Sequence, residues 1–217
     1  MDDGTLAKVL FYDIVRQTKW PAGISAVDAD NCYDQIAHPI ASLIFQSLGV
    51  PQEAAVSMLS TMQDMIFFLR TGFEDSNVYA GSTDGKKMQG LCQGNGAAPV
   101  GWTVTSMAMI NAHKRKGHGV HLTSPITKAA IHPVGTLFVG DTDLEHFDMN
   151  KVETITAVHE ALQQSIHKWG LLLIATSGSL KPGKCFYHLI LFSWNSDGTW
   201  RYETNKQLSD LGIMVPL

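Results

Sequence analysis

The chain has 217 residues, of which 45% are hydrophobic and 17% are charged, and its formal net charge is -4. A chain of this length forms one domain or at most two and can bury enough surface to fold without disulfide bonds. This net charge is slightly negative, whereas a free-standing nucleic-acid binder usually carries a basic face. So small a share of charged residues predicts that part of the surface is normally covered.

Neither the N-terminus nor the cysteines indicate export. Residues 1–3 do not begin the cationic, apolar and small-residue progression of a secretory signal. Cys32, Cys92 and Cys185 are odd in number and far apart, which fits neither a disulfide framework nor a CxxC metal site. The longest apolar stretch, near residues 97–110, is too short to cross a bilayer. We therefore expect an intracellular protein, in the cytoplasm or the nucleus, with no membrane segment.

The first predicted elements are a strand and two helices. Residues 24–27 suit a strand that ends at Asp28, and a helix is expected over residues 35–48. Gly49 is expected to end that helix. A second, amphipathic helix is expected over residues 51–70, because apolar side chains recur there at helical spacing. These side chains are Met58, Leu59, Met62, Met65, Ile66 and Leu69.

The middle of the chain predicts a hairpin and a buried helix. Residues 77–91 read as two short strands around a turn at residues 82–85. The glycine-rich loop QGNG follows and leads into a buried helix over residues 97–112. The order of these elements is that of a mixed α+β domain.

A connection and a second hairpin come next. Residues 113–133 contain histidine, glycine and proline without periodicity, which predicts an exposed connection with no packed element. Residues 134–139 and 142–147 are then expected to form two strands around a tight turn at Gly140 and Asp141.

The last third predicts a helix followed by strands. Asn150 is expected to cap a helix that runs to Gly170, with Glu153 three residues after the cap. Strands are expected near residues 184–193 and 199–204. The order of elements favours one α+β layer pair in which helices cover one face of the sheet.

Two aspartates next to predicted strands indicate a metal site. Asp28 ends the first strand and Asp141 belongs to the hairpin, so the fold can bring together two carboxylates from distant strands. Phosphoryl transfer uses a pair of Mg²⁺ ions about 4 Å apart that hard oxygen ligands hold. The alternative for Asp28 alone is a helix cap or a solvated turn residue, which is the commoner role of an acid at a strand end.

Four ordered blocks of the chain resemble the reverse transcriptase family, the RNA-directed DNA polymerases of retroelements. The first block, VDADNCYDQIAH, is similar to motif A through Asp28, Tyr33 and Asp34. The resemblance implies that Asp28 binds both metals. It also implies that the Tyr33 ring lies beneath the incoming sugar, where a 2′-hydroxyl would clash. A core aromatic is the alternative for Tyr33.

The second block, GLCQGNGAAP, is similar to motif B, whose loop and helix press on the nascent base pair in the family. Gly90, Gln93, Gly94 and Pro99 match, while Cys92 and Ala98 replace the usual proline and serine. Glycines in this loop let the backbone approach a base or sugar closely. A plain glycine-rich turn or a weak phosphate-binding loop is the alternative, although the lysine of a P-loop is missing.

The third block, LFVGDTDL, is similar to motif C, in which an aromatic precedes two adjacent aspartates. Phe138 and Asp141 match, but Gly140 stands where the family has the first aspartate, its principal metal ligand with Asp28. The resemblance therefore implies an impaired site with weak or no activity. Asp143 lies two residues beyond Asp141 on the same strand face, so it is a third candidate metal ligand.

The fourth block, WGLLLIATSGSLKPGKCFY, looks like motif D. In the family a lysine at this place can protonate the leaving pyrophosphate, and Lys184 is the best match, with Lys181 behind it. A solvated lysine is the alternative for Lys184. The segment LSDLGIMV near the C-terminus is similar to the start of motif E, the primer grip.

Three histidines are candidates for a separate metal site. His113, His118 and His121 lie in the predicted connection without a cysteine or acid at ligand spacing. A solvated loop is the interpretation that we favour for them.

The resemblance implies that residues 1–217 form one palm domain with an antiparallel, ferredoxin-like sheet covered by helices on one face. Fingers and thumb are expected to be largely absent, since few residues precede Asp28 and few follow motif E. The implied function is template-directed DNA synthesis by two-metal nucleotidyl transfer, weak or inactive because of Gly140. The alternative is a catalytically dead palm that acts as a structural, oligomerising or nucleic-acid-contacting module.

The partners and cofactors follow from these two interpretations. An active palm would use Mg²⁺ or Mn²⁺, a nucleic-acid template-primer and deoxynucleoside triphosphates, whereas an inactive one needs no cofactor. The missing fingers and thumb segments are further expected partners. Self-association is expected as well, because large exposed apolar surfaces rarely stay bare.

Overall fold

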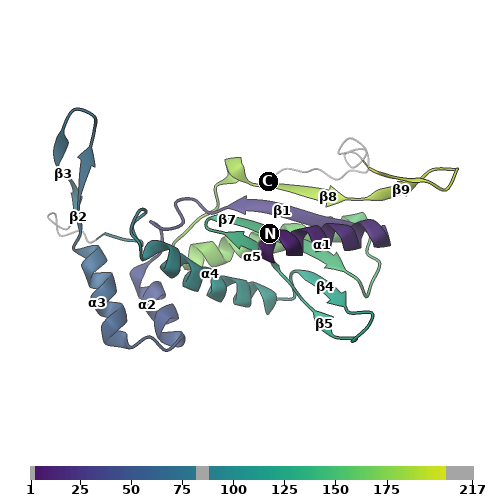
Figure 1. The fold of residues 1–217 in the computed structure, drawn as a ribbon, viewed down its shortest axis with the longest axis horizontal. Coiled ribbons are helices and arrows are strands. Elements are labelled where there is room, and N and C mark those ends of the chain that lie inside the picture. The colour runs from purple at the N-terminus through teal and green to yellow at the C-terminus, as the bar shows by residue number, and fades with distance from the viewer. Residues whose placement is uncertain (1–2, 82–87, 204–217) are drawn as a thin grey trace. The chain divides into compact units, whose positions relative to one another are not determined.

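The computed structural model describes residues 3–81 and 88–203, which divide between two compact units (Figure 1). The first, called the sheet unit, comprises the chain up to residue 29, residues 109–173 and the chain from residue 180. The second, called the helical unit, comprises residues 30–108 and 174–179. The single-domain interpretation stays a prediction.

The sheet unit is built on a six-stranded sheet in the order β5-β4-β7-β1-β8, with β6 paired to β7. All the pairings are antiparallel except that of β4 with β7, which is parallel. A separate hairpin joins β9 and β10. The elements of this unit are α1 (Asp3–Thr18), β1 (Ala22–Asp28), the end of α4 (Ala98–Lys114), β4 (Val120–Thr123), β5 (Ala130–Ile131), β6 (Gly135–Phe138), β7 (Asp141–Asp148), most of α5 (Ile155–Ala175), the 3₁₀ turn η2 (Pro182–Lys184), β8 (Phe186–Ile190), β9 (Phe192–Trp194) and β10 (Trp200–Tyr202).

Strand β1 pairs on both sides, with β7 and with β8, and its small side chains let a helix pack closely on it. A Cβ on Gly23 would lie 3.0 Å from Leu162 and 3.3 Å from Val158, so α5 packs directly on this strand. Leu162 and Val158 are themselves fully buried. The predicted strand before Asp28, the hairpin of β6 and β7 and the long helix after them are all confirmed as elements.

Helices cover both faces of the sheet, so the expectation that they cover only one face is wrong. Side chains alternate along a strand, and the register puts Asp28 opposite Asp141 and Ala26 opposite Asp143 on one face. We call this the acid face. The other face meets α5, whereas α1 packs on the acid face through Phe11 and Val15, which are buried (Figure 1). Residues 3–18, which form α1, are not among the predicted elements.

The helical unit differs from the prediction at the end of its second helix. Its elements are α2 (His38–Ser47), α3 (Gln52–Gln63), β2 (Ile66–Arg70), β3 (Asp75–Gly81) and the beginning of α4. The helix that was predicted to reach Arg70 ends at Gln63, because Ile66, Phe67 and Phe68 favour an extended strand that pairs with β3. Arg70 and Asp75 close this hairpin with a 2.7 Å ion pair.

Two further boundaries in the helical unit are corrected. A hairpin was expected within residues 77–91, but the strand in this stretch, β3, pairs with the preceding strand β2. The predicted turn at residues 82–85 lies outside the described residues. Helix α2 begins at His38 rather than at residue 35, with Pro39 in its first turn. Gly49, with φ +91°, follows this helix as expected.

The predicted connection over residues 113–133 is wrong in the sheet unit. His113 belongs to α4, which runs to Lys114, and β4 and β5 lie within the same stretch. Val120 of β4 is fully buried and pairs with Phe147. The stretch lacks periodicity because its strands are too short to establish one.

Two local predictions about turns and caps are also wrong. The tight turn of the β6–β7 hairpin consists of Val139 and Gly140, so Asp141 is the first residue of β7 rather than a turn residue. Helix α5 starts at Ile155, and its capping side chain is Thr154, whose Oγ1 accepts the Ala157 N–H at 3.2 Å. Asn150 instead accepts a hydrogen bond from Thr123. No helix among the described residues is both long and apolar enough to cross a membrane.

Candidate active site

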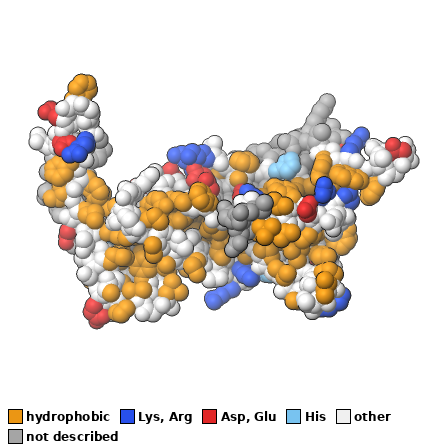
Figure 2. Space-filling view, viewed as in Figure 1, with side chains coloured by type: hydrophobic (Ala, Val, Ile, Leu, Met, Phe, Trp, Pro, Cys, Tyr) orange, Lys and Arg blue, Asp and Glu red, His pale blue; other side chains and the backbone are white. Residues whose placement is uncertain are grey.

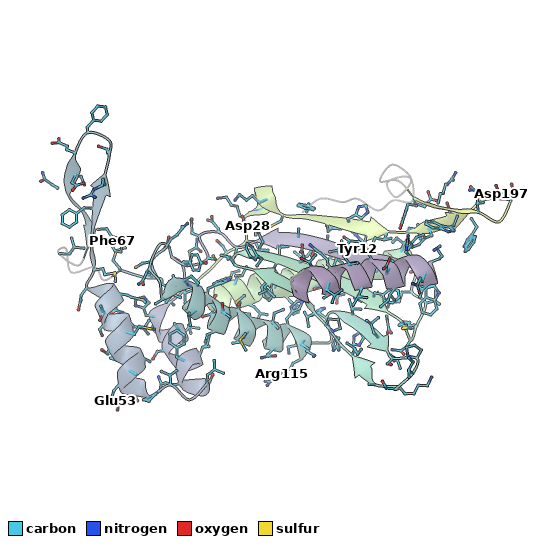
Figure 3. The ribbon with its side chains drawn as sticks, viewed as in Figure 1. Tyr12, Asp28, Glu53, Phe67, Arg115 and Asp197 are labelled. Carbon is cyan, nitrogen blue, oxygen red and sulfur yellow. The ribbon has the colours of Figure 1, made fainter. Side chains whose placement is uncertain are left out.

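Asp28 and Asp141 lie directly opposite each other at one end of the acid face. Asp28 is the last residue of β1 and Asp141 the first residue of β7, and their Cα atoms are partners in the antiparallel register. Opposite side chains in such a pair have Cβ atoms about 5 Å apart. The Ala29 N–H donates to the Gly140 carbonyl at 3.0 Å, which holds the hairpin turn against the end of β1. Two carboxylates from distant parts of the sequence are thus brought together, at the end of β1 where Figure 3 labels Asp28.

The turn beside this pair departs from ordinary backbone geometry. Val139 has φ +55°, a left-handed conformation that is unfavourable for a β-branched residue. Such a residue costs about 1–3 kcal/mol and persists only where its surroundings hold it in place. Gly140 follows it, is buried, and offers its carbonyl to Ala29. The position that carries the first aspartate of the family pattern is therefore a turn position in this chain.

Lys184 contacts the acid pair from the turn η2. Its Nζ lies 3.2 Å from the Asp28 Oδ2, and its side chain is 64% exposed whereas that of Asp28 is 15% exposed. The backbone N–H of Lys181 donates to the Asp28 carbonyl at 2.9 Å. The Asp28 N–H also donates to the Cys185 sulfur at 3.5 Å, a contact that was not predicted from the sequence. The segment after α5 therefore contacts both the side chain and the backbone of Asp28.

Asp143 shares the acid face but has a different partner. Lys8 of α1 forms an ion pair with the Asp143 carboxylate, and this hydrogen bond raises the pKa of Lys8. Within the described part of the chain, no three His, Cys, Asp or Glu side chains converge on a point that could hold a metal ion. The arrangement therefore offers two carboxylates, Asp28 and Asp141, and keeps Asp143 paired with Lys8.

Glu145 continues the same row of acids into the covered part of the face. It is only 4% exposed, and its Oε1 has no hydrogen-bond partner among the described residues. Burial and, to a smaller extent, the neighbouring Asp143 raise the pKa of Glu145 to about 7, although Lys8 acts to lower it. Glu145 is not among the residues predicted from the sequence, although acids at alternating positions of one strand are a signal that could have revealed it.

The acid pair suits a single hard divalent ion better than a fully enclosed metal site. Mg²⁺ commonly binds through one or two carboxylates and takes its other ligands from water and substrate phosphates. Asp28 and Asp141 provide such a pair of oxygen ligands, and Asp141 is exposed to solvent. Lys184 shows that a cation already fits beside Asp28.

In the helical unit, the segments that resemble motifs A and B are joined by hydrogen bonds. The Gln93 N–H donates to the Asp34 carboxylate at 2.9 Å, and the Leu91 N–H donates to the Tyr33 carbonyl at 2.6 Å. A Cβ on Gly90 would overlap the Asp34 backbone, so only glycine fits there. Tyr33 is half-buried and Gln93 is exposed, as is its neighbour Gly94 with φ +92°.

Phe138 lies next to the acid pair in the sheet unit. It is the last residue of β6 and the register partner of Asp141, so its ring is on the acid face. Its side chain is 77% exposed. An aromatic ring this exposed is available to contact a ligand at the acid pair.

The histidines expected in a solvated loop are largely packed. His113 is fully buried, its Nε2 lies 2.9 Å from the Ser165 Oγ, and burial lowers its pKa to about 4. Its ring stacks on that of His118 at 4.7 Å, and the rings of His121 and His132 stack at 3.9 Å. The loop interpretation of His113 is therefore wrong, because this residue sits in the last turns of α4.

Comparison with known proteins identifies the fold. No protein-family model matches the chain, and no curated protein matches it. The structure of telomerase from Candida albicans in complex with a TWJ fragment of telomeric RNA is similar, with a TM-score of 0.53 and 11% identity. An apo telomerase from Candida tropicalis, truncated from its C-terminal domain, is similar with a TM-score of 0.53 and 10% identity.

These likenesses cover nearly the whole chain but only part of the telomerases. They span 91% and 93% of this chain, and 31% and 40% of the two telomerase chains. At such low identity they show the fold alone, which this chain shares with part of each telomerase.

Proposed function

We propose, from this polymerase-like fold, that the chain is the palm domain of a reverse transcriptase and performs template-directed DNA synthesis weakly. The observation that carries the proposal is the register of β1 and β7, which puts Asp28 opposite Asp141 on one sheet face. Two carboxylates in this relation can hold a divalent cation of the kind that nucleotidyl transfer uses. The telomerase neighbours support a polymerase but do not specify this chain's substrates.

Each residue of the acid pair has a defined task in this proposal. Asp28 and Asp141 would hold Mg²⁺ or Mn²⁺, which when bound activates the primer 3′-hydroxyl and neutralises charge on the phosphates. Lys184, whose ammonium reaches Asp28, would hold a proton for the leaving pyrophosphate. A lysine that is mostly exposed can turn from the carboxylate to a phosphate without disturbing the fold.

Four further residues would contact the nucleotide or the template. Phe138, exposed opposite Asp141, would pack against the nucleotide, and Tyr33 would select against a 2′-hydroxyl. Gln93 and Gly94 are exposed in a loop that Asp34 holds, which suits a backbone that approaches a base pair closely.

Weak activity follows from the missing third ligand. Gly140 replaces a carboxylate in the family pattern, and Asp143, the nearest substitute, is engaged by Lys8. Loss of a direct metal ligand should cost more than the roughly 10 to 100-fold that follows loss of an outer-shell partner. Gly140→Asp is therefore expected to increase primer extension by more than about 100-fold.

Primer extension with Mg²⁺ or Mn²⁺ tests the proposal. Gly140→Asp should extend a primer, and both Asp28→Asn and Asp141→Asn in that background should abolish extension. Asp148→Asn is the matched control, because it removes an acid from the far end of the same strand, beyond the pairing with β1. Brisk extension that survives Asp28→Asn would refute the metal assignment.

The second candidate function is a catalytically inactive palm that contacts nucleic acid or other subunits. The pairing of Asp28 and Asp143 with lysines favours it, because both acids are satisfied without a metal. Exposed apolar side chains on the outer side of α1, Leu6, Val9 and Leu10, would drive self-association (Figure 2). Absence of extension in every variant together with template-primer binding would select this function, and sedimentation would reveal the self-association.

A further inference from the structure

A small pocket opens on the acid face, away from the Asp28 and Asp141 pair. Its volume is about 230 Å³, and five residues of α1, β8 and β10 line it. Val15 and Ile190 are buried and form an aliphatic floor, whereas Tyr12, His188 and Tyr202 are exposed or half-exposed around it. All five belong to the sheet unit. Figure 3 labels Tyr12 on α1, where this helix crosses the sheet.

The size of the pocket limits its ligand. Pockets for drug-sized ligands measure about 300 to 1,000 Å³. A pocket of about 230 Å³ is below that range and suits a single ring system rather than a whole nucleoside triphosphate or cofactor. The aliphatic floor excludes a charged group, because burying a charge without a partner is costly.

The rim of the pocket is pre-organised to contact a flat ring. The Tyr202 ring packs against those of Phe192 at 4.9 Å and Trp200 at 5.3 Å, which fixes its position. Burial raises the pKa of Tyr12, so its phenol is neutral. Lys19 lies over the Trp200 ring at 4.0 Å and puts a positive charge beside this aromatic group.

The pocket and the acid pair share one sheet face. His188 is the register partner of Ile24, which lies on the order of 13 Å from Asp28 along β1. Sites that hold single-stranded nucleic acid combine aromatic rings for the bases with cations for the backbone. A strand whose end lies at Asp28 could therefore extend along the sheet to this pocket.

We propose that the pocket between α1, β8 and β10 binds one unstacked base of a single-stranded nucleic acid, by stacking on Tyr202 and Tyr12 over the Val15 and Ile190 floor. This inference rests on the proposed function only in taking nucleic acid as the partner, and it requires no catalysis. The shared chemistry is a planar aromatic ring, which a base within a strand or a free nucleotide could supply.

Binding of fluorescent single-stranded 12-mers to the full chain, followed by anisotropy, tests the proposal. Oligonucleotides with a single abasic site at each position in turn would locate the base that enters the pocket. Tyr202→Ala should weaken binding of the intact strand about tenfold, and Tyr202→Phe should leave it nearly unchanged, since one stacked base contributes about 1–3 kcal/mol. His188→Trp, which fills the mouth of the pocket, should act like Tyr202→Ala.

Controls separate the pocket from general effects. Phe73→Ala removes a fully exposed aromatic from the helical unit and should not change binding. Equal thermal unfolding of Tyr202→Ala and Tyr202→Phe excludes a folding defect, and Tyr202→Ala should also remove the sensitivity to one abasic position. Wild-type binding that no abasic site weakens would overturn the proposal, as would occupation of the pocket by free nucleoside monophosphates but not by a strand. Strand binding with this pattern but without primer extension would refute only the proposed function.

Discussion

The two ends of the acid face carry the same kind of side chain in different surroundings. At the open end, Asp141 is exposed and faces Asp28, whereas at the covered end Glu145 is buried beneath α1 and titrates near neutral pH. Asp143 lies between them and is paired with Lys8. These acids alternate along one strand, so their difference comes from what covers each of them rather than from their spacing.

This contrast explains why a row of carboxylates is not by itself a metal site. A carboxylate is available to a cation only where water or a ligand can replace its partners, and burial instead favours its neutral form. Only the end of the face beyond α1 meets this condition. The cover that α1 provides therefore determines where on the sheet the chemistry can take place.

The largest expected effect on stability comes from a substitution that weakens the packing of α1 on the covered end of the acid face. Phe147→Ala removes a ring that is 1% exposed and packs with Phe11 and Val15 of α1. It should lower the free energy of unfolding by about 3–5 kcal/mol. Urea denaturation measures this loss. Phe186→Ala on β8, whose ring is 64% exposed, is the matched control and should cost far less. Equal losses in the two variants would mean that α1 does not cover the sheet as described.

The next effect is a pH dependence that belongs to Glu145. Its pKa is about 7 in the folded chain against an ordinary value of 4.5, so the folded state holds an extra proton between these values. The free energy of unfolding should therefore fall as the pH rises from about 4.5 to about 7, by at most about 3 kcal/mol. Glu145→Gln should remove this part of the pH dependence in urea unfolding at a series of pH values. If Glu145→Gln shows the same pH dependence of the free energy of unfolding as the wild type, this dependence does not come from Glu145.

The smallest effect on stability is expected from the ion pair of Lys8 and Asp143, which lies between the two ends of the acid face. Lys8 and Asp143 are partly exposed, so solvent screens their attraction and its contribution to stability should stay below about 1 kcal/mol. A double-mutant cycle with Lys8→Met and Asp143→Asn measures the coupling. A coupling of several kcal/mol would show that α1 depends on this pair rather than on Phe11 and Val15.

The sequence anticipated the elements that have a strong local pattern. The strand before Asp28, a long helix after Asn150 and the hairpin around Gly140 all follow from periodicity or turn residues, although that helix begins and ends later than predicted, at Ile155 and Ala175. Helix α1 was not recognised, and the helix predicted to Arg70 was too long, because Ile66 to Phe68 fit either a helix face or a strand. Tertiary pairing with β3 decided between these two possibilities.

For the site, the sequence by itself selected Asp28 and Asp141, because acids beside strands are local features, and Lys184 through its resemblance to motif D of the reverse transcriptase family. Their closeness depends on the register of β1 and β7 and on the turn η2, which join segments far apart in the chain. The sequence did not reveal that Asp143, the third candidate ligand, is paired with Lys8, or that Glu145 is buried. Only the tertiary structure decided this, because the partners and the solvent exposure of an acid come from the helix that covers it.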